Sequence, residues 1–103
     1  MTKVDHKFGS MEIYTDRIVL KKNFPSFPFC QNENTVFYFQ EIVSIVKKYK
    51  RPFVDDPFIW LDFGGNFPIF YGSMLKNSIP FRTNEEMEAA YAILIEYFNA
   101  AKA

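Results

Sequence analysis

The chain has almost none of the residues from which catalytic and metal sites are commonly built. Among 103 residues it holds one cysteine, Cys30, and one histidine, His6. A single cysteine forms no internal disulfide, and this pair is too small for a structural zinc site, so no metal or cofactor is expected. We expect Cys30 to be a small buried side chain, because no local base would activate its thiol, and His6 to be structural or exposed.

The chain also lacks an excess of charge of either sign and a long apolar run. Twelve Lys and Arg balance twelve Asp and Glu, so binding to nucleic acid or to an anionic membrane would need a local patch. The longest uncharged run, FGGNFPIFYGSML, is too short to span a bilayer. The opening residues, MTKVDHKF, have no apolar signal-peptide core, and a cytoplasmic protein is therefore expected.

Apolar and aromatic residues are abundant instead. They make up 49% and 19% of the chain, with 13 Phe and 6 Tyr, which excludes low-complexity disorder. At this length a chain buries roughly two-thirds of its unfolded surface, enough for one core. No repeat or linker divides it, and residues 1–103 are expected to form a single domain.

Short alternating or β-branched runs predict a mostly β fold. A hairpin is expected over 11–22, where Met11 and Ile13 alternate with polar residues before a turn at Thr15, Asp16 and Arg17. A loop is expected over 23–34, and two strands with a bend at Gln40 and Glu41 over 35–50. A second hairpin is expected from 58–63 to 67–71, and an edge strand over 78–81 because of Pro80.

One amphipathic helix is predicted at the end, over 82–98. Thr83 as N-cap with Glu86 three residues later is a capping-box pattern. The apolar residues of this segment recur at helical spacing and form one stripe, which we expect to pack on the sheet. The stripe consists of Met87, Ala90, Tyr91, Leu94, Ile95 and Phe98.

Three phrases of the chain resemble a known fold family. MEIYTDRIVLKK is similar to the opening hairpin of small bacterial pleckstrin-homology-like (PH-like) and GRAM-like domains, VFYFQEIVSIV to their apolar strand, acidic bend and next strand, and IPFRTNEEMEAAYAILIEYF to their last strand and helix. The resemblance implies an α+β, mostly β domain: a strongly bent antiparallel sheet or partial barrel of about seven strands, with the C-terminal helix closing one open end. It also implies a binding module, since none of these phrases is a catalytic signature.

The sequence departs from the phosphoinositide-binding members of that family. Those members use basic residues in and beside the first hairpin, helped by two other loops. Here the first turn is Thr15 to Arg17, the bend is Gln40 and Glu41, and the later loop GSMLKN offers only Lys76. An anion with several phosphates would meet few donors, so specific binding at the usual site is not expected.

One basic cluster forms the candidate binding site together with a phenylalanine-rich loop. The cluster consists of Lys47, Lys48, Lys50 and Arg51, and the loop carries Phe24, Phe27 and Phe29. In a strand meander both segments emerge on the same side, and aromatics beside cations suit a protein partner or a membrane interface. The alternatives are a solvated strand end whose lysines discourage edge pairing, and phenylalanines folded back over the core.

Other residues that could carry chemistry have simpler interpretations. Asp55 and Asp56 between prolines are typical of a solvated loop, and Asp62 is expected to face outward from its strand. Gly64 and Gly65 lack the following Lys-Ser/Thr of a phosphate-binding loop, and Trp60 is expected in the core rather than stacking on bases.

No nucleophile lies beside a base to activate it, so an enzyme is not expected. The sequence predicts a non-catalytic interaction module that binds a protein partner or assembles with itself, without nucleic acid. The alternative is peripheral association with an anionic membrane through the aromatic and basic residues.

Overall fold

The computed structural model describes residues 1–23, 32–51, 56–64 and 77–103, with the backbone alone at 32 and 33. Within these ranges the chain forms seven strands in two antiparallel sheets, followed by one C-terminal helix. The first sheet contains β1 (Thr2–His6), β2 (Gly9–Ile13), β3 (Arg17–Asn23) and β4 (Asn32–Tyr38), in that order. The second contains β5 (Ser44–Lys48), β6 (Phe58–Asp62) and β7 (Ser78–Pro80). The expectation of a mostly β, α+β fold is confirmed.

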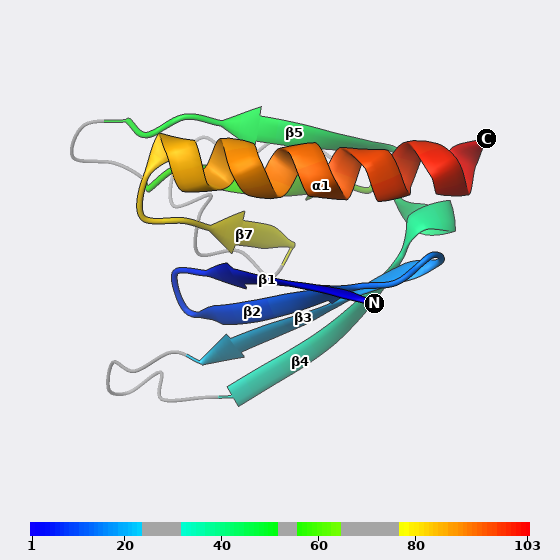
Figure 1. Cartoon of the computed structure of the whole chain (residues 1–103), viewed down its shortest axis with the longest axis horizontal. Coiled ribbons are helices and arrows are strands. Elements are labelled where there is room, and N and C mark those ends of the chain that lie inside the picture. Colours follow the sequence, from blue (N-terminus) through cyan, green and yellow to red (C-terminus); the bar gives the residue numbers. More distant parts are fainter. Residues whose placement is uncertain (24–31, 52–55, 65–76) are drawn as a thin grey trace.

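The two sheets are joined by the bend that the sequence predicted. A short 3-10 helix, η1 (Phe39–Glu41), follows β4 and includes Gln40 and Glu41. In Figure 1 the first sheet lies below, the second sheet and α1 lie above it, and β1 is the strand of the first sheet nearest to β7. The backbone N–H of Lys7, in the turn after β1, donates to the carbonyl of Pro80 at 2.8 Å, so the two sheets meet at this point.

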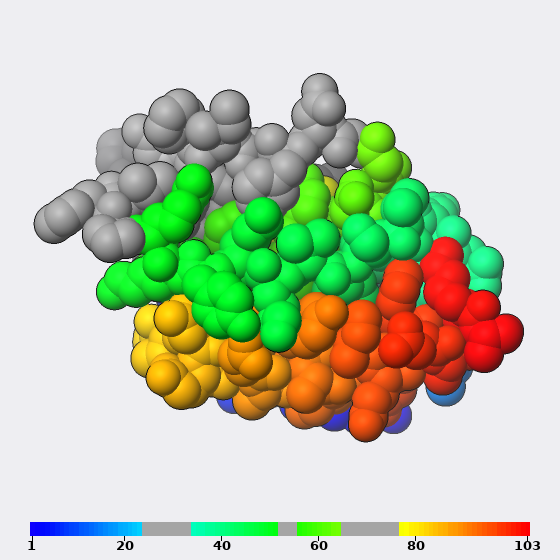
Figure 2. Space-filling model, turned by 90° about the horizontal axis from the view of Figure 1, so that it is seen from above, coloured from blue at the N-terminus to red at the C-terminus, as the bar shows by residue number. Residues whose placement is uncertain are grey.

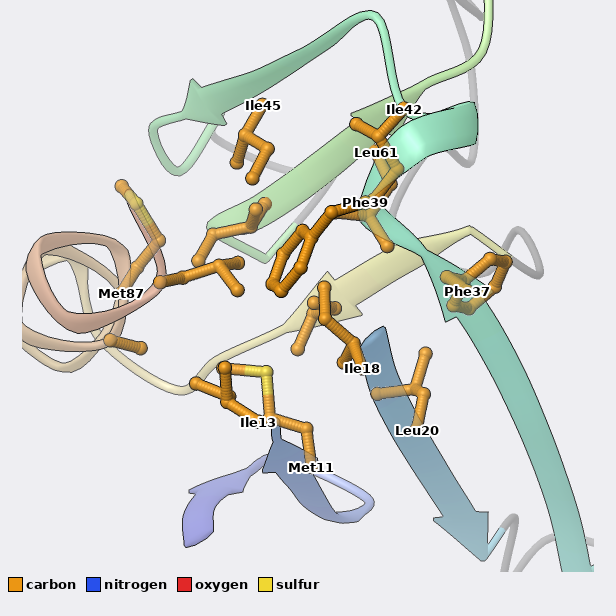
Figure 3. Close-up of a cluster of buried hydrophobic side chains, with 14 of the residues drawn as sticks. Met11, Ile13, Ile18, Leu20, Phe37, Phe39, Ile42, Ile45, Leu61 and Met87 are labelled. Atoms are coloured by element: carbon orange, nitrogen blue, oxygen red, sulfur yellow. The ribbon is translucent and has the colours of Figure 1, made fainter. Parts of the chain in front are cut away.

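Core side chains come from both sheets and from the helix. On β2 and β3 the predicted alternation is confirmed, because Met11, Ile13, Ile18 and Leu20 are all buried. Figure 3 shows these side chains of the first sheet pointing toward Phe39, Leu61 and Met87, which come from η1, β6 and α1 on the other side of the core. Burial of such large apolar side chains, at about 1.5–3 kcal/mol each, is the main stabilising term of a domain this small.

Strand β6 is buried on both faces. Ile59 and Leu61 belong to the central core, and Phe58 and Trp60, which alternate with them, are 1% and 8% exposed. The second sheet is therefore not a solvent-facing surface at β6, and Trp60 is buried as predicted.

The closing helix, α1 (Asn84–Lys102), begins where the sequence placed it. Thr83 is the N-cap, and its Oγ1 accepts a hydrogen bond from the Glu86 N–H at 3.1 Å. Met87, Ala90 and Leu94 are buried, and the rest of the stripe packs partly buried against the core. At the other end of α1, Gln40 Nε2 donates to the carbonyl of Ala101 at 3.3 Å. The helix thus lies on β5, β6 and η1, and it continues four residues beyond the predicted end at 98.

Two predictions of extent were wrong, and a third lies outside the described residues. Strand β1 was not expected, because its inward side chains, Thr2, Val4 and His6, include only one aliphatic residue. The loop predicted over 23–34 is shorter at both ends, because β3 and β4 pair up to Asn23 and Asn32. The strand predicted over 67–71 and the hairpin turn before it lie outside the described residues, so the seven strands observed are not the same seven as those expected.

Candidate functional site

The basic cluster lies where β5 ends beside the first half of α1. Lys47 and Lys48 are the last residues of β5, and Lys50 and Arg51 follow directly. Lys50 is exposed, whereas the other three are half-buried. Figure 2 shows β5 and the residues after it (green) lying alongside α1 (yellow to red), so the helix forms one wall of this site.

Lys47 is bound to the helix. Its Nζ lies 3.3 Å from Oε1 of Glu88 and 4.8 Å from the centroid of the Tyr91 ring. The Tyr49 hydroxyl donates to the same Glu88 oxygen. One carboxylate therefore joins two side chains at the end of β5 to α1, and we call Lys47, Tyr49, Glu88 and Tyr91 the β5–α1 clasp.

The clasp stabilises both of its charges. Hydrogen bonding from Tyr49 and then from Lys47 lowers the pKa of the Glu88 carboxyl, and the hydrogen bond to Glu88 raises the pKa of Lys47. Each shift favours the charged form of its group. At neutral pH the clasp is an ammonium beside a carboxylate, and Lys47 presents little net charge to a ligand.

The rest of the cluster is also engaged. The backbone N–H of Lys50 donates to Asn84 Oδ1 at 3.0 Å, at the first residue of α1. Lys48 and Arg51 each make a further interaction. The Lys47 side chain and the Lys50 backbone thus join the end of β5 to the helix.

The aromatic half of the candidate site is not described. Phe24, Phe27 and Phe29 lie outside the described residues, as do Cys30, Asp55 and Lys76. Their expected position beside the basic cluster stays a prediction.

Other residues singled out in the sequence have structural contacts. Asp56 Oδ2 lies 2.5 Å from Lys7 Nζ, and Asp62 accepts from Ser44 Oγ at 3.1 Å and from the Gly64 N–H at 2.7 Å.

In the first turn, Arg17 pairs with Asp16 at 2.8 Å and lies over the Tyr14 ring. The one cation of that turn is therefore partly neutralised.

His6 is a buried structural residue at the β1–β2 turn. Its Nε2 lies 2.9 Å from the carbonyl of Lys21, and its Nδ1 accepts from the Phe8 N–H at 3.2 Å. The two contacts together assign a neutral ring with the proton on Nε2. Burial, reinforced by the positive charge of Lys22, lowers the pKa of His6 despite the opposing hydrogen bond to the Lys21 backbone and the nearby carboxylate of Asp5.

Lys22 is a buried lysine that the sequence analysis missed. It is 2% exposed near the end of β3, and it makes a polar, charged or ring contact there. The signal was present, because Lys22 follows Ile18 and Leu20 at strand spacing and so shares their inward face.

Exposed apolar side chains gather along β4. Val36 and Tyr38, on its outward face, are both 46% exposed. At the other side of the strand, Phe63 is 38% exposed and packs on the Phe37 ring with centroids 5.6 Å apart. Val43, 63% exposed, hydrogen-bonds through its N–H to the carbonyl of Asp62, next to Phe63. We call Val36 and Tyr38 the β4 surface, which periodicity alone did not identify.

In the described part of the chain, open grooves lie beside α1. One, of about 450 Å³, lies between its last turns and the β2–β3 turn and is lined by Thr15, Glu96, Tyr97, Ala100 and Ala101. The other, of about 330 Å³, lies between the first half of α1 and β1. Its lining consists of Val4, Asp5, His6, Arg82, Glu86, Ala89, Ala90 and Ile93.

Within the part of the chain that the structure describes, no three His, Cys, Asp or Glu side chains are grouped to hold a metal ion. In the same ranges, no helix is both long and apolar enough to cross a membrane. Comparison with protein-family models, with curated proteins and with solved structures found no match.

Proposed function

We propose that this chain is a PH-like domain that acts as a non-catalytic interaction module, in the cytoplasm of a bacterium, binding a protein partner or a second copy of itself. The order of elements supports the PH-like part of the proposal. Four antiparallel strands, a bend, three further strands and a C-terminal helix follow the order that the sequence resemblance implies. A core enclosed by both sheets and α1 fits a bent sheet whose open end the helix closes.

The observation that carries the interaction proposal is the β4 surface. Val36 and Tyr38, which are neighbours on the outward face of one strand, are both 46% exposed. Strand β4 pairs only with β3 among the described residues, so it is an end strand of its sheet there. Apolar groups at a sheet edge suit a protein partner, which could cover them and add backbone hydrogen bonds along the strand.

The basic cluster supports this choice over membrane binding. An anionic lipid surface attracts free cations, worth about 1 kcal/mol each near the membrane. Lys47 is already bound to Glu88, which leaves one free cation fewer in the cluster. Membrane association through Phe24, Phe27, Phe29 and the basic cluster is therefore the second candidate.

The test compares two double variants with equal added charge. Val36→Lys with Tyr38→Lys alters the β4 surface, and Ala92→Lys with Asn99→Lys places the same charges on exposed positions of α1. We expect immobilised wild type and the α1 variant to retain the same protein from a lysate, and the β4 variant to lose it. Equal retention by all three would contradict the role of the β4 surface.

Liposomes decide between the two candidates. Wild type is expected to stay in the supernatant with vesicles containing anionic lipid. Sedimentation with such vesicles that is lost at high salt, and in a Phe27→Ala, Lys48→Glu double variant, would favour the membrane alternative instead.

A further inference from the structure

Strand β1 has a second edge that β2 does not use. Among the described residues β1 pairs only with β2, in a register that places Val4 opposite Met11. Among the described residues, a backbone hydrogen bond from the Lys7 N–H to the carbonyl of Pro80 lies on the side of this second edge. That bond shows which way the edge faces, and it lies just past the end of β1.

The free backbone groups of this edge belong to Lys3 and Asp5. Backbone hydrogen-bonding direction alternates along a strand, so residues two and four positions before Lys7 direct their N–H and C=O to the same side as Lys7. Both residues are exposed, and no further strand lies beside them in the described ranges. The edge is therefore a short template for another strand.

The side chains of β1 are self-complementary. The strand reads Thr2-Lys3-Val4-Asp5-His6, with a cation and a carboxylate placed symmetrically about Val4. If two copies pair antiparallel about a two-fold axis at Val4, Lys3 of each copy lies opposite Asp5 of the other. In that register Lys3 and Asp5 are also the hydrogen-bonded positions, so side chains and backbone favour the same alignment.

The neighbouring strand extends this charge pattern. Within one copy, Lys3 lies opposite Glu12 and Asp5 opposite Ser10. Across the two-fold axis each lysine would lie between two carboxylates, Glu12 of its own copy and Asp5 of the second. Like charges would not meet directly opposite each other in this row.

The groove beside β1 accommodates the inward side of the second strand. Val4 is half-buried and lines this groove with Ala89, Ala90 and the 36% exposed Ile93. Pairing about Val4 would place the Val4 side chain of the second copy beside these residues. The small side chains of the two alanines leave room for this valine, and the valine would cover Ile93 and shield it from water.

We infer that the occupant of the β1 edge is a second copy of this chain, joined through antiparallel β1–β1 pairing centred on Val4 with reciprocal Lys3–Asp5 ion pairs. The inference rests on the self-association part of the proposed function and uses a different surface from β4. A two-fold axis closes the assembly at a dimer, because each copy uses its β1 edge once.

Charge exchange at the two positions tests this pairing. Lys3→Asp places two carboxylates opposite each other at both ends of the paired strands, and Asp5→Lys places two lysines there. Either variant is expected to raise the dimer dissociation constant at least about tenfold, as two repulsive contacts replace two attractive ones. The variant carrying both substitutions restores opposite charges and is expected to dimerise like wild type.

Mixing gives the sharpest outcome. An equimolar mixture of Lys3→Asp and Asp5→Lys chains pairs every carboxylate with a lysine, so light scattering should report a heterodimer where each variant alone is a monomer. A wild-type dimer that is unchanged in both variants, or a mixture that stays monomeric, would overturn β1 pairing.

If that dimer is lost in the Val36→Lys, Tyr38→Lys variant instead, the proposed function survives without this inference. Wild type that stays at the 12.2 kDa of one chain up to millimolar concentration would overturn the inference and leave only a foreign protein partner.

Discussion

The carboxylate of Glu88 on α1 lies 3.3 Å from the ammonium of Lys47 on β5, although 41 residues separate them. This contact changes the interpretation of the basic cluster. Lys47, which looked available to an anionic surface, instead joins the closing helix to the second sheet. The surfaces that we propose for partners are those of the first sheet, at β1 and β4.

Glu88→Gln is expected to loosen the clasp without unfolding the domain. The substitution removes the charge that pairs with Lys47 while leaving a hydrogen-bond acceptor for Tyr49. A small decrease in Tm is expected, because exposed ion pairs are screened by water, and it should shrink further in high salt. Glu96→Gln, on an exposed part of the same helix, is the matched control. A Tm decrease that is equal in both variants would contradict a specific role for the clasp.

His6 makes stability depend on pH in a defined window. Its pKa is lowered in the folded state, so the unfolded chain, with an ordinary pKa of about 6.5, binds the proton first as pH falls. The stabilisation is fully present above about pH 6.5 and is lost as pH falls from there through the folded pKa. Protonated Nδ1 would also lose its hydrogen bond from the Phe8 N–H.

The single histidine makes this measurement unambiguous. One imidazole resonance in the NMR spectrum reports its titration, and we expect a midpoint below 6.5 in the folded protein. The groups that face the ring are Lys22 and Asp5, with Arg82 and Glu86 lining the same groove. A midpoint above 6.5 would contradict the dominance of burial, because the hydrogen bond to the Lys21 backbone and the Asp5 carboxylate would then outweigh burial and Lys22.

Gly9 allows the tight approach of the β1–β2 turn to β3. Its φ is +153°, and a Cβ there would lie 2.4 Å from the carbonyl oxygen of Lys21. Gly9→Ala is expected to destabilise by roughly 1–3 kcal/mol or more, since neither backbone can move freely. Gly64→Ala is the matched control, because Gly64 has φ +96° but its nearest neighbour among the described residues, Val43 Cγ2, would lie 3.9 Å from the added Cβ. It therefore separates backbone strain from the clash. Chemical denaturation should show the larger loss at Gly9, and the reverse order would contradict the close approach.

Adjacent helix positions test which face of α1 is buried. Leu94 is 0% exposed, whereas Ile93 is 36% exposed. Leu94→Ala is expected to lower the free energy of unfolding by about 2–5 kcal/mol, and Ile93→Ala by less than about 1 kcal/mol when measured on dilute protein. Equal losses would show that the helix is rotated from its position in this structure.

The elements with strong local signals were predictable from sequence. Thr83 and Glu86 mark the start of α1, and the alternation of Met11, Ile13, Ile18 and Leu20 marks the first predicted hairpin. Residues in these elements follow the period of their own backbone, so the local pattern was enough.

The remaining features depend on contacts distant in sequence. Strand β1 has mostly polar inward residues, and it is identified only by its pairing with β2 and by Tyr97, whose hydroxyl lies 2.6 Å from Thr2 Oγ1. The basic cluster was visible as a run of charges, but its binding to Glu88 required the packing of α1 on β5. Periodicity also gave no indication that Val36 and Tyr38 face water.

The most direct measurement is an amide NMR spectrum of the ¹⁵N-labelled protein recorded as its concentration is raised. Self-association through the first sheet predicts shifts and line broadening at residues 2–6 and around Ile93, which should disappear in Lys3→Asp. A spectrum that does not change with concentration, together with shifts at Lys47 to Arg51 on addition of anionic lipid, would contradict the interaction surfaces proposed for this domain.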